Sequence, residues 1–155
     1  MRLRTATPAD IEALLPCVAD FHAHERLSTT PAGRQDAIER LLREPARGRI
    51  VLAEHEVLAG GGMAGLHILG YGIVVFGYSI EFGGIDAFVD ELYVVPSHRG
   101  RGIGTRILAG LEDAAKAGGS LCAHLEVDVD NAGALELYAR LGYKAHQRHL
   151  MTKRL

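Results

Sequence analysis

Cysteine is scarce in this chain of 155 residues, and the two that are present, Cys17 and Cys122, lie far apart in unrelated contexts. Such usage excludes a disulfide framework and provides no Cys-x-x-Cys pair for a metal or redox centre. The sequence opens without the apolar core of a signal peptide, so we expect a cytoplasmic protein. Apolar residues at 48% and charged residues at 23% exclude intrinsic disorder, and the length predicts a single domain over residues 1–155.

Lysine and arginine are absent from Ile50 to His98, a span that contains six acidic residues. One interpretation is that strands in the core of a sheet carry few charges. The other is a negative cleft that attracts a cationic substrate. The net charge of −2 over the whole chain argues against a nucleic-acid partner, which would require a basic surface.

An uncharged segment of 24 residues runs from Val57 to Ile80, which is long enough to span a membrane as a helix. Seven of these residues are glycine, and acidic rather than basic residues flank the segment. We therefore expect no membrane span but two glycine-bent strands, covering about 49–54 and 66–80, joined by a turn at Gly60-Gly61-Gly62.

The remaining elements are predicted from hydrophobic periodicity and from proline and glycine positions. Helices are expected from Thr7 with a kink or break at Pro16, over about 30–44, over about 102–117, and from Asp130 or Asn131 to Gly142. Further strands are expected over 85–95, over 121–129, and once or twice between Tyr143 and Leu155. This order predicts an α+β fold.

The most informative segment, Val94 to Thr105, contains a strand end, a glycine-rich loop and the start of an amphipathic helix. Glycine at positions 100, 102 and 104 allows backbone N–H groups to approach a ligand closely. The positive end of the helix then favours a phosphate or pyrophosphate. Neither a P-loop nor a dinucleotide fingerprint fits, because Thr105-Arg106 follows Gly104.

This segment resembles the acyl-CoA signature of the GNAT superfamily of N-acetyltransferases, with Arg99-x-x-Gly102-x-Gly104 after Leu92-Tyr93-Val94-Val95-Pro96. A second block similar to that family runs from Leu125-Glu126-Val127 through Asn131 to the stretch 134–143. The resemblance covers nearly the whole chain. It implies a mixed, mostly antiparallel central sheet flanked by about four helices, and acetyl-CoA as co-substrate.

The resemblance also implies roles for individual residues. The main chain of the segment 92–94 is expected to pair with the pantetheine arm of acetyl-CoA, and Asn131 to hydrogen-bond it. Tyr138 is expected to be the general acid for the departing thiolate. The expected cofactor-binding residues are Leu92, Tyr93, Val94, Arg99, Gly100, Arg101, Gly102, Ile103, Gly104, Thr105 and Asn131.

An alkylamine is protonated at neutral pH, so its attack on a thioester needs a base. Asp90, Glu91 and Glu126 are the candidates. Alternation along a strand predicts that Asp90 and Glu91 point to opposite faces and cannot share a role. Members of the family differ in which carboxylate serves, and we favour Glu91.

The acceptor side is predicted from two segments. The stretch from Tyr78 to Glu91 is similar to members that act on small amines and polyamines, so Glu81 and Asp86 are expected to hold an ammonium group and Tyr78 to stack on it. His22 and Glu25 are expected on the wall that the first helices form in this family. The histidines show no metal-ligand spacing, so no metal is expected.

The predicted function is therefore acetyl transfer from acetyl-CoA to a primary amine of a small molecule, including polyamine-like ones, by direct attack in a ternary complex. The alternatives are acetylation of a protein N-terminus or lysine, and a catalytically idle acyl-CoA-binding regulatory module. The family resemblance also allows a homodimer.

Overall fold

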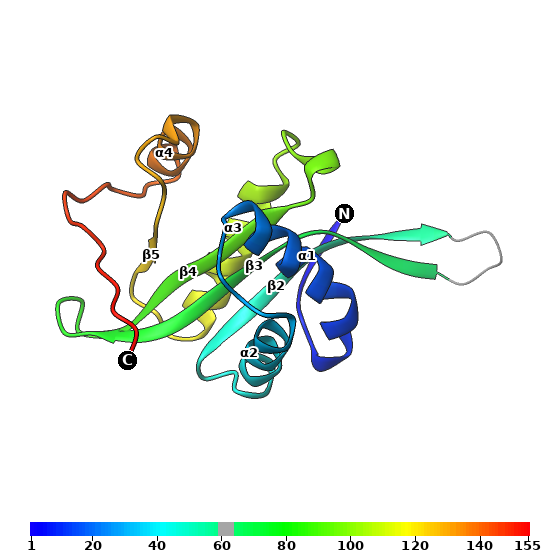
Figure 1. Cartoon of the computed structure of the whole chain (residues 1–155). Helices are drawn as coiled ribbons and strands as arrows, with labels where there is room; N and C mark the ends of the chain where they lie inside the picture. The colour runs from blue at the N-terminus through cyan, green and yellow to red at the C-terminus, as the bar shows by residue number, and fades with distance from the viewer. Residues whose placement is uncertain (59–63) are drawn as a thin grey trace. The chain divides into compact units, whose positions relative to one another are not determined.

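Five strands form one sheet in the order β1-β2-β3-β4-β5 in the computed structural model, which describes residues 1–58 and 64–155, and side chains outside 56–66 (Figure 1). The strands are β1 (Arg2–Thr5), β2 (Gly48–Leu58), β3 (Ala64–Ser79), β4 (Gly84–Val94) and β5 (Ala123–Leu125). Neighbouring strands pair antiparallel except β4 and β5, which are parallel. The predicted mixed, mostly antiparallel sheet is confirmed.

Four α-helices accompany the sheet among the described residues: α1 (Ile11–His24), α2 (Pro31–Arg43), α3 (Ile103–Ala117) and α4 (Ala132–Arg140). Short 3-10 turns, η1 (Pro8–Asp10) and η2 (Pro96–His98), precede α1 and α3. Thr30 caps α2 as predicted, because its hydroxyl accepts a hydrogen bond from the Gly33 amide at 3.1 Å. Pro16 lies inside α1, which continues through it rather than splitting.

The chain divides into two compact units, Met1–Leu125 and Glu126–Leu155. The first contains the sheet and helices α1 to α3, and the second contains α4. The long helix α3 packs on β3 at Gly72, where an added Cβ would lie 2.6 Å from the Leu111 side chain. Tyr71, the preceding residue, points to the opposite face and joins the core formed with α1 and α2, including Leu14, Val18 and Ile38.

A β-bulge interrupts the pairing of β3 with β4. Ile73 pairs with Glu91 and Val74 pairs with Val89, so Asp90 is an extra residue without a partner on β3. A bulge breaks the strict alternation of side chains between the two faces of a strand. The sequence pattern did not predict it, and it changes the expected relation between Asp90 and Glu91.

The C-terminal segment differs from the prediction. No strand occurs between Tyr143 and Leu155, where one or two were expected, because every residue after Tyr143 is exposed and no apolar face is buried. The strand predicted over 121–129 is limited to Ala123–Leu125, which pairs only with Ala87 to Val89.

The uncharged segment from Val57 to Ile80 lies largely in β2 and β3, as predicted, and the expected turn at 60–62 falls outside the described residues. Within the described part of the chain, no helix is long and apolar enough to cross a membrane.

Strand β1, which was not predicted, is joined to its neighbours by an arginine. The Arg4 guanidinium donates to Glu54 on β2 at 2.9 Å and to both oxygens of Asp10 at 2.8 and 2.6 Å. Glu54 is only 1% exposed, so the ion pair offsets the cost of burying its charge. The hydrogen bonds from Arg4 lower the pKa of Asp10 to about 2.

Candidate functional site

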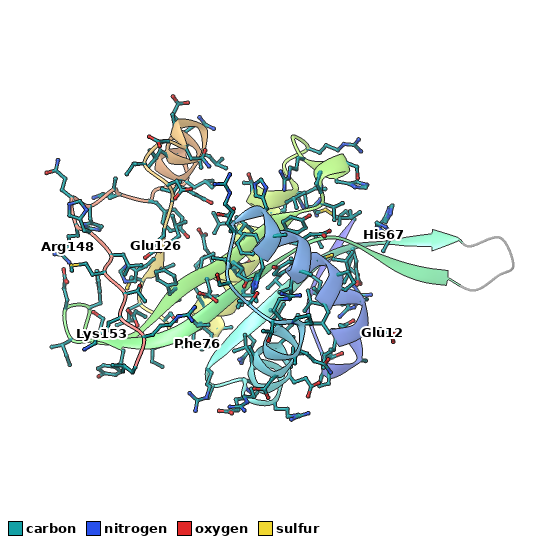
Figure 2. All side chains as sticks on the ribbon, in the orientation of Figure 1. Glu12, His67, Phe76, Glu126, Arg148 and Lys153 are labelled. Atoms are coloured by element: carbon teal, nitrogen blue, oxygen red, sulfur yellow. The ribbon has the colours of Figure 1, made fainter. Side chains whose placement is uncertain are left out.

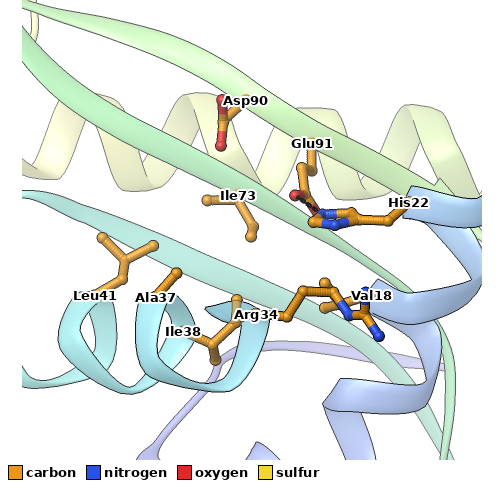
Figure 3. A pocket seen from close by; sticks show the side chains of 9 residues that line it. All are labelled: Val18, His22, Arg34, Ala37, Ile38, Leu41, Ile73, Asp90 and Glu91. Atoms are coloured by element: carbon orange, nitrogen blue, oxygen red, sulfur yellow. Dashed lines mark hydrogen bonds and ion pairs between the residues drawn. The ribbon is translucent and has the colours of Figure 1, made fainter. Parts of the chain in front are cut away.

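A cavity of about 100 Å³ lies in the first unit, between helices α1 and α2 and strands β3 and β4 (Figure 3). Its lining combines apolar side chains with two carboxylates, an imidazole and a guanidinium. The lining residues are Val18, His22, Arg34, Ala37, Ile38, Leu41, Ile73, Asp90 and Glu91. A small apolar cavity with a few convergent polar groups is typical of a binding site for a small molecule.

Glu91 receives hydrogen bonds on both of its carboxylate oxygens. The Tyr71 hydroxyl donates to Oε2 at 2.5 Å, and Nε2 of His22 lies 2.7 Å from Oε1. The side chains of His22 and Glu91 are each only 11% exposed. Burial, with the nearby charge of Glu91 as a second cause, raises the pKa of Tyr71 far above its usual value, so this phenol remains a donor.

The other ring nitrogen of His22 is held by Thr29. Nδ1 of His22 lies 2.8 Å from the Thr29 hydroxyl, which itself accepts a hydrogen bond from Arg34 at 3.1 Å. Because the Thr29 oxygen accepts from Arg34, its own proton is free to be donated to Nδ1. In the tautomer with the proton on Nε2, His22 accepts from Thr29 at Nδ1 and donates to Glu91.

Asp90 shares the cavity with Glu91, which corrects the expectation that the two carboxylates face opposite sides of the sheet. The physical reason is the bulge at Asp90, which shifts the alternation at this position. Desolvation raises the pKa of Asp90, and the nearby His22 partly opposes this rise. Asp90 nevertheless keeps an exposed surface.

The loop from Arg99 to Thr105, the predicted phosphate loop, includes two glycines in the left-handed backbone conformation. Gly100 and Gly102 have φ angles of 74° and 72°, a region that other residues rarely adopt. Gly102 is the N-cap of α3 and provides no side-chain cap for the amides of Ile103, Gly104 and Thr105. Such donors at the positive end of a helix can bind a phosphate group.

The two arginines of this loop differ in their contacts. Nε of Arg99 donates to the Val94 carbonyl at 2.9 Å, and its guanidinium lies over the Tyr93 ring at 5.6 Å from the ring centre. Arg101 is exposed. Arg99 thus fixes the loop against the end of β4.

The predicted pantetheine-binding stretch of β4 has a free edge within the first unit. β5 pairs only with Ala87 to Val89, so no strand described in Met1–Leu125 pairs with that edge from Leu92 to Val94. Backbone groups on a free edge can pair with an amide-containing arm as they would with a further strand.

Three predicted residues, Glu126, Asn131 and Tyr138, belong to the second unit. Asn131 caps α4, because its side-chain oxygen accepts from the Ala134 amide at 3.1 Å. Tyr138 lies on α4 with its ring 5.9 Å from that of Tyr143, and burial raises the pKa of its phenol. Glu126 is exposed.

Four residues predicted on the acceptor side do not line the cavity. Tyr78 is 70% exposed, and Glu81 lies beyond it in the turn between β3 and β4. Asp86 lies 3.6 Å from His124, and the exposed Glu25 lies 4.0 Å from His24. Of the predicted acceptor residues, the structure brings only His22 to Glu91.

Sequence reasoning missed Tyr71, Thr29 and Arg34. Arg34 carries a usable signal, since it lies four residues before Ile38 and seven before Leu41, on the predicted apolar face of the helix. Tyr71 gives no such signal, because its pairing with Glu91 depends on the register that the bulge sets.

A group of three histidine rings lies near the phosphate loop but outside the cavity. The ring centres of His55, His67 and His98 are 5.7 to 6.3 Å apart, and Figure 2 shows His67 on the arm of the β2–β3 hairpin. Among the side chains that the structure describes, those outside 56–66, no set of three or more ligating groups is arranged to hold a metal ion.

Comparison with known proteins gave consistent matches. The sequence pattern of the acetyltransferase (GNAT) family matches residues 16–143. A thialysine N-epsilon-acetyltransferase from Bos taurus is 28% identical over 144 residues, covering 90% of this chain and 82% of its own. An aminoalkylphosphonate N-acetyltransferase from Salmonella typhimurium is 27% identical over 142 residues, covering 92% and 84%. The crystal structure of a probable acetyltransferase matches with a TM-score of 0.81 at 18% identity, covering 100% and 98%.

Proposed function

The chain belongs to the acetyltransferase (GNAT) family, and on that premise we propose that it transfers the acetyl group of acetyl-CoA to a primary amine of a small molecule. The observation that carries this proposal is the Glu91 carboxylate, held between Tyr71 and His22 at a small cavity. By their names, the two relatives compared above also act on amines.

Glu91 is the proposed general base. The acceptor arrives as an ammonium ion, and only the neutral amine has a lone pair to attack the thioester carbonyl. A carboxylate has lone pairs beyond the two that His22 and Tyr71 engage, so Glu91 can take the proton directly or through water. His22 and Tyr71 position Glu91, and Asp90 is the alternative base in the same cavity.

Acetyl-CoA supplies the activated acetyl group. The edge of β4 at Leu92, Tyr93 and Val94 would hold its pantetheine arm, and the loop from Arg99 to Thr105 its pyrophosphate. The free strand edge and the uncapped start of α3 support this assignment. Asn131 is proposed to donate to the arm through its side-chain amide nitrogen, since its oxygen caps α4.

The transfer needs no covalent enzyme intermediate. The amine nitrogen bonds to the carbonyl carbon, a backbone amide stabilises the oxyanion, and the carbon–sulfur bond breaks. Tyr138 is proposed to give the departing thiolate its proton. A phenol is protonated at neutral pH and so has a proton to give, and burial raises the pKa of this one further.

The size of the cavity favours a small acceptor. The cavity, of about 100 Å³, has room for a short amine, whereas a peptide would need a longer groove. Acetylation of a protein N-terminus or lysine is therefore the less favoured activity.

The test combines binding with turnover. Saturating acetyl-CoA should raise the melting temperature, since 100-fold excess over Kd adds about 2.7 kcal/mol of stability. A panel of amines and of peptides with a free N-terminus or lysine would then be assayed for thiol release and acetylated product. No melting shift at millimolar acetyl-CoA would overturn the proposal. A shift without turnover would indicate the idle acyl-CoA-binding module, and turnover of peptides alone the protein acetyltransferase.

A further inference from the structure

The guanidinium of Arg34 is a cation on the cavity wall with no acidic partner. Its Nη1 donates to the backbone oxygen and the hydroxyl of Thr29, at 3.2 and 3.1 Å, and both acceptors are neutral. No acidic side chain among the described residues forms an ion pair with it. Two other arginines of α2, Arg40 and Arg43, each pair with an acidic residue four positions earlier.

The contacts with Thr29 use only Nη1 of Arg34, and no described residue accepts from Nε–H or Nη2, so these donors remain for a ligand. These donors form the planar fork that matches a carboxylate or phosphonate through two parallel hydrogen bonds. Because Thr29 anchors Nη1, less side-chain freedom is lost when the fork binds an anion. Figure 3 shows Arg34 and His22 projecting into the same space from α2 and α1.

The opposite charge lines the other part of the cavity. Glu91 is linked to Arg34 through His22 and Thr29, by contacts of 2.7, 2.8 and 3.1 Å, and Asp90 lies beside Glu91. Apolar side chains of Val18, Ile38, Leu41 and Ile73 complete the wall. The cavity thus presents carboxylates, an apolar surface and a guanidinium within about 100 Å³.

We propose that the acceptor is a short zwitterionic amine, whose amino group meets Glu91 and Asp90 and whose acidic group is bound by Arg34. This inference rests on the proposed acetyltransferase function and names its substrate class. The acidic group is a carboxylate or a phosphonate, which share the chemistry that the fork recognises. The sequence analysis included polyamine-like acceptors, but a short diamine or polyamine fits this cavity worse than a zwitterion does. Its second ammonium group would lie near the Arg34 guanidinium and be repelled by it.

The experiment compares four acceptors of similar length in the acetyl-CoA assay: 3-aminopropanoate, 2-aminoethylphosphonate, propylamine and 1,3-diaminopropane. The two acidic acceptors should give a kcat/KM at least about 10-fold above that of propylamine, the gain expected from charged hydrogen bonds. Their relative values distinguish a carboxylate from a phosphonate ligand. Preference for propylamine or the diamine would overturn the proposal.

Arg34→Met tests the residue itself, since it keeps an apolar stem and removes the charge. It should raise KM for the acidic acceptors about 10- to 100-fold relative to propylamine, with a smaller change in kcat. Arg34→Lys should recover part of the loss. Arg40→Met is the matched control on the same helix, and its acceptor preference should equal that of the unmodified protein.

The outcomes separate this inference from the proposed function. If Arg34→Met affects propylamine as strongly as the acidic acceptors, Arg34 acts only by supporting Thr29 and His22, and the zwitterion proposal is wrong. Acetylation of plain amines without a preference for acidic ones would also overturn it, while leaving the acetyltransferase function standing. Failure of acetyl-CoA binding would defeat both.

Discussion

Glu91 is the residue at which the proposed chemistry can be tested most directly. Glu91→Gln keeps the size of the side chain but removes its capacity to accept a proton. We expect kcat to fall by about 10² to 10⁴, the usual contribution of a general base, with the KM for acetyl-CoA nearly unchanged. The pH–rate profile should also lose its dependence on the ionisation of this carboxylate. Steady-state kinetics across pH provides the measurement.

Tyr138→Phe is the control for this experiment, because it changes the proposed acid and leaves the base intact. Turnover should fall, while the decrease of the rate at low pH should remain as in the unmodified protein. If Glu91→Gln also keeps this decrease at low pH, the assignment is contradicted, and Asp90 or Glu126 becomes the candidate base.

At the residue scale, the sequence named Glu91 as a candidate base and His22 as a residue of the acceptor wall, but it did not predict the contact between them. Glu91 and His22 were both named as candidates, yet 69 residues separate them and no periodicity relates α1 to β4. Asp90 was assigned to the wrong face because alternation assumes an uninterrupted strand. The sequence gives no sign that Tyr71 contacts Glu91, because this contact depends on the pairing register of β3 with β4.

At the element scale, the loop before α3 depends on the backbone conformation of Gly102. Gly102→Ala should lower the free energy of unfolding by about 1 to 2 kcal/mol, because a Cβ at φ 72° clashes with its own backbone. The distorted helix start should also weaken acetyl-CoA binding. Urea unfolding and a titration with acetyl-CoA measure the two effects.

Gly133→Ala in α4 is the matched control for this substitution. An added Cβ meets nothing within 4 Å at either position, so the two glycines differ in backbone conformation rather than in available space. We expect Gly133→Ala to be neutral or to stabilise by up to about 1 kcal/mol. Equal losses in the two variants would refute the conformational explanation.

Most elements were predictable because their signals are local. Thr30-Pro31 starts α2, and the four-residue spacing of Ile103, Ile107 and Leu111, which places them along one helix face, marks α3. β1 was missed because it is only four residues long and includes two arginines, so it has no apolar alternation. The bulge was missed because its position depends on how β3 and β4 pair. The sequence of either strand alone does not specify that pairing.

At the scale of the whole molecule, the Arg4–Asp10 pair links stability to pH. The pKa of Asp10 is about 2 in the folded state against 3.8 for the free group, so its contribution is complete above about pH 4 and is lost as the pH falls through about 2. The difference corresponds to about 2 kcal/mol. Asp10→Asn should therefore be destabilised by about that amount at pH 7, and the gap should narrow by pH 2 in denaturant unfolding.

Asp36→Asn is the control for the pH experiment. Asp36 pairs with Arg40 at the surface, where both side chains are more than half exposed, so its loss should change stability by less than about 1 kcal/mol. A stability gap for Asp10→Asn that stays constant between pH 7 and pH 2 would show that the Arg4 pair does not cause the effect.

Within the first unit, the edge of β4 that no described strand covers also bears on how the protein behaves in concentrated solution. A row of free backbone N–H and C=O groups is a template on which the edge of another copy can add, and such contacts lead to aggregation. Asp90, which keeps an exposed surface, stands at the start of this edge, and its negative charge repels a second copy that approaches in the same way. Beyond it, from Leu92 to Val94, a bound pantetheine arm would cover the row. The co-substrate of the proposed reaction would thus serve a second purpose, as a cap that keeps the protein from associating with itself.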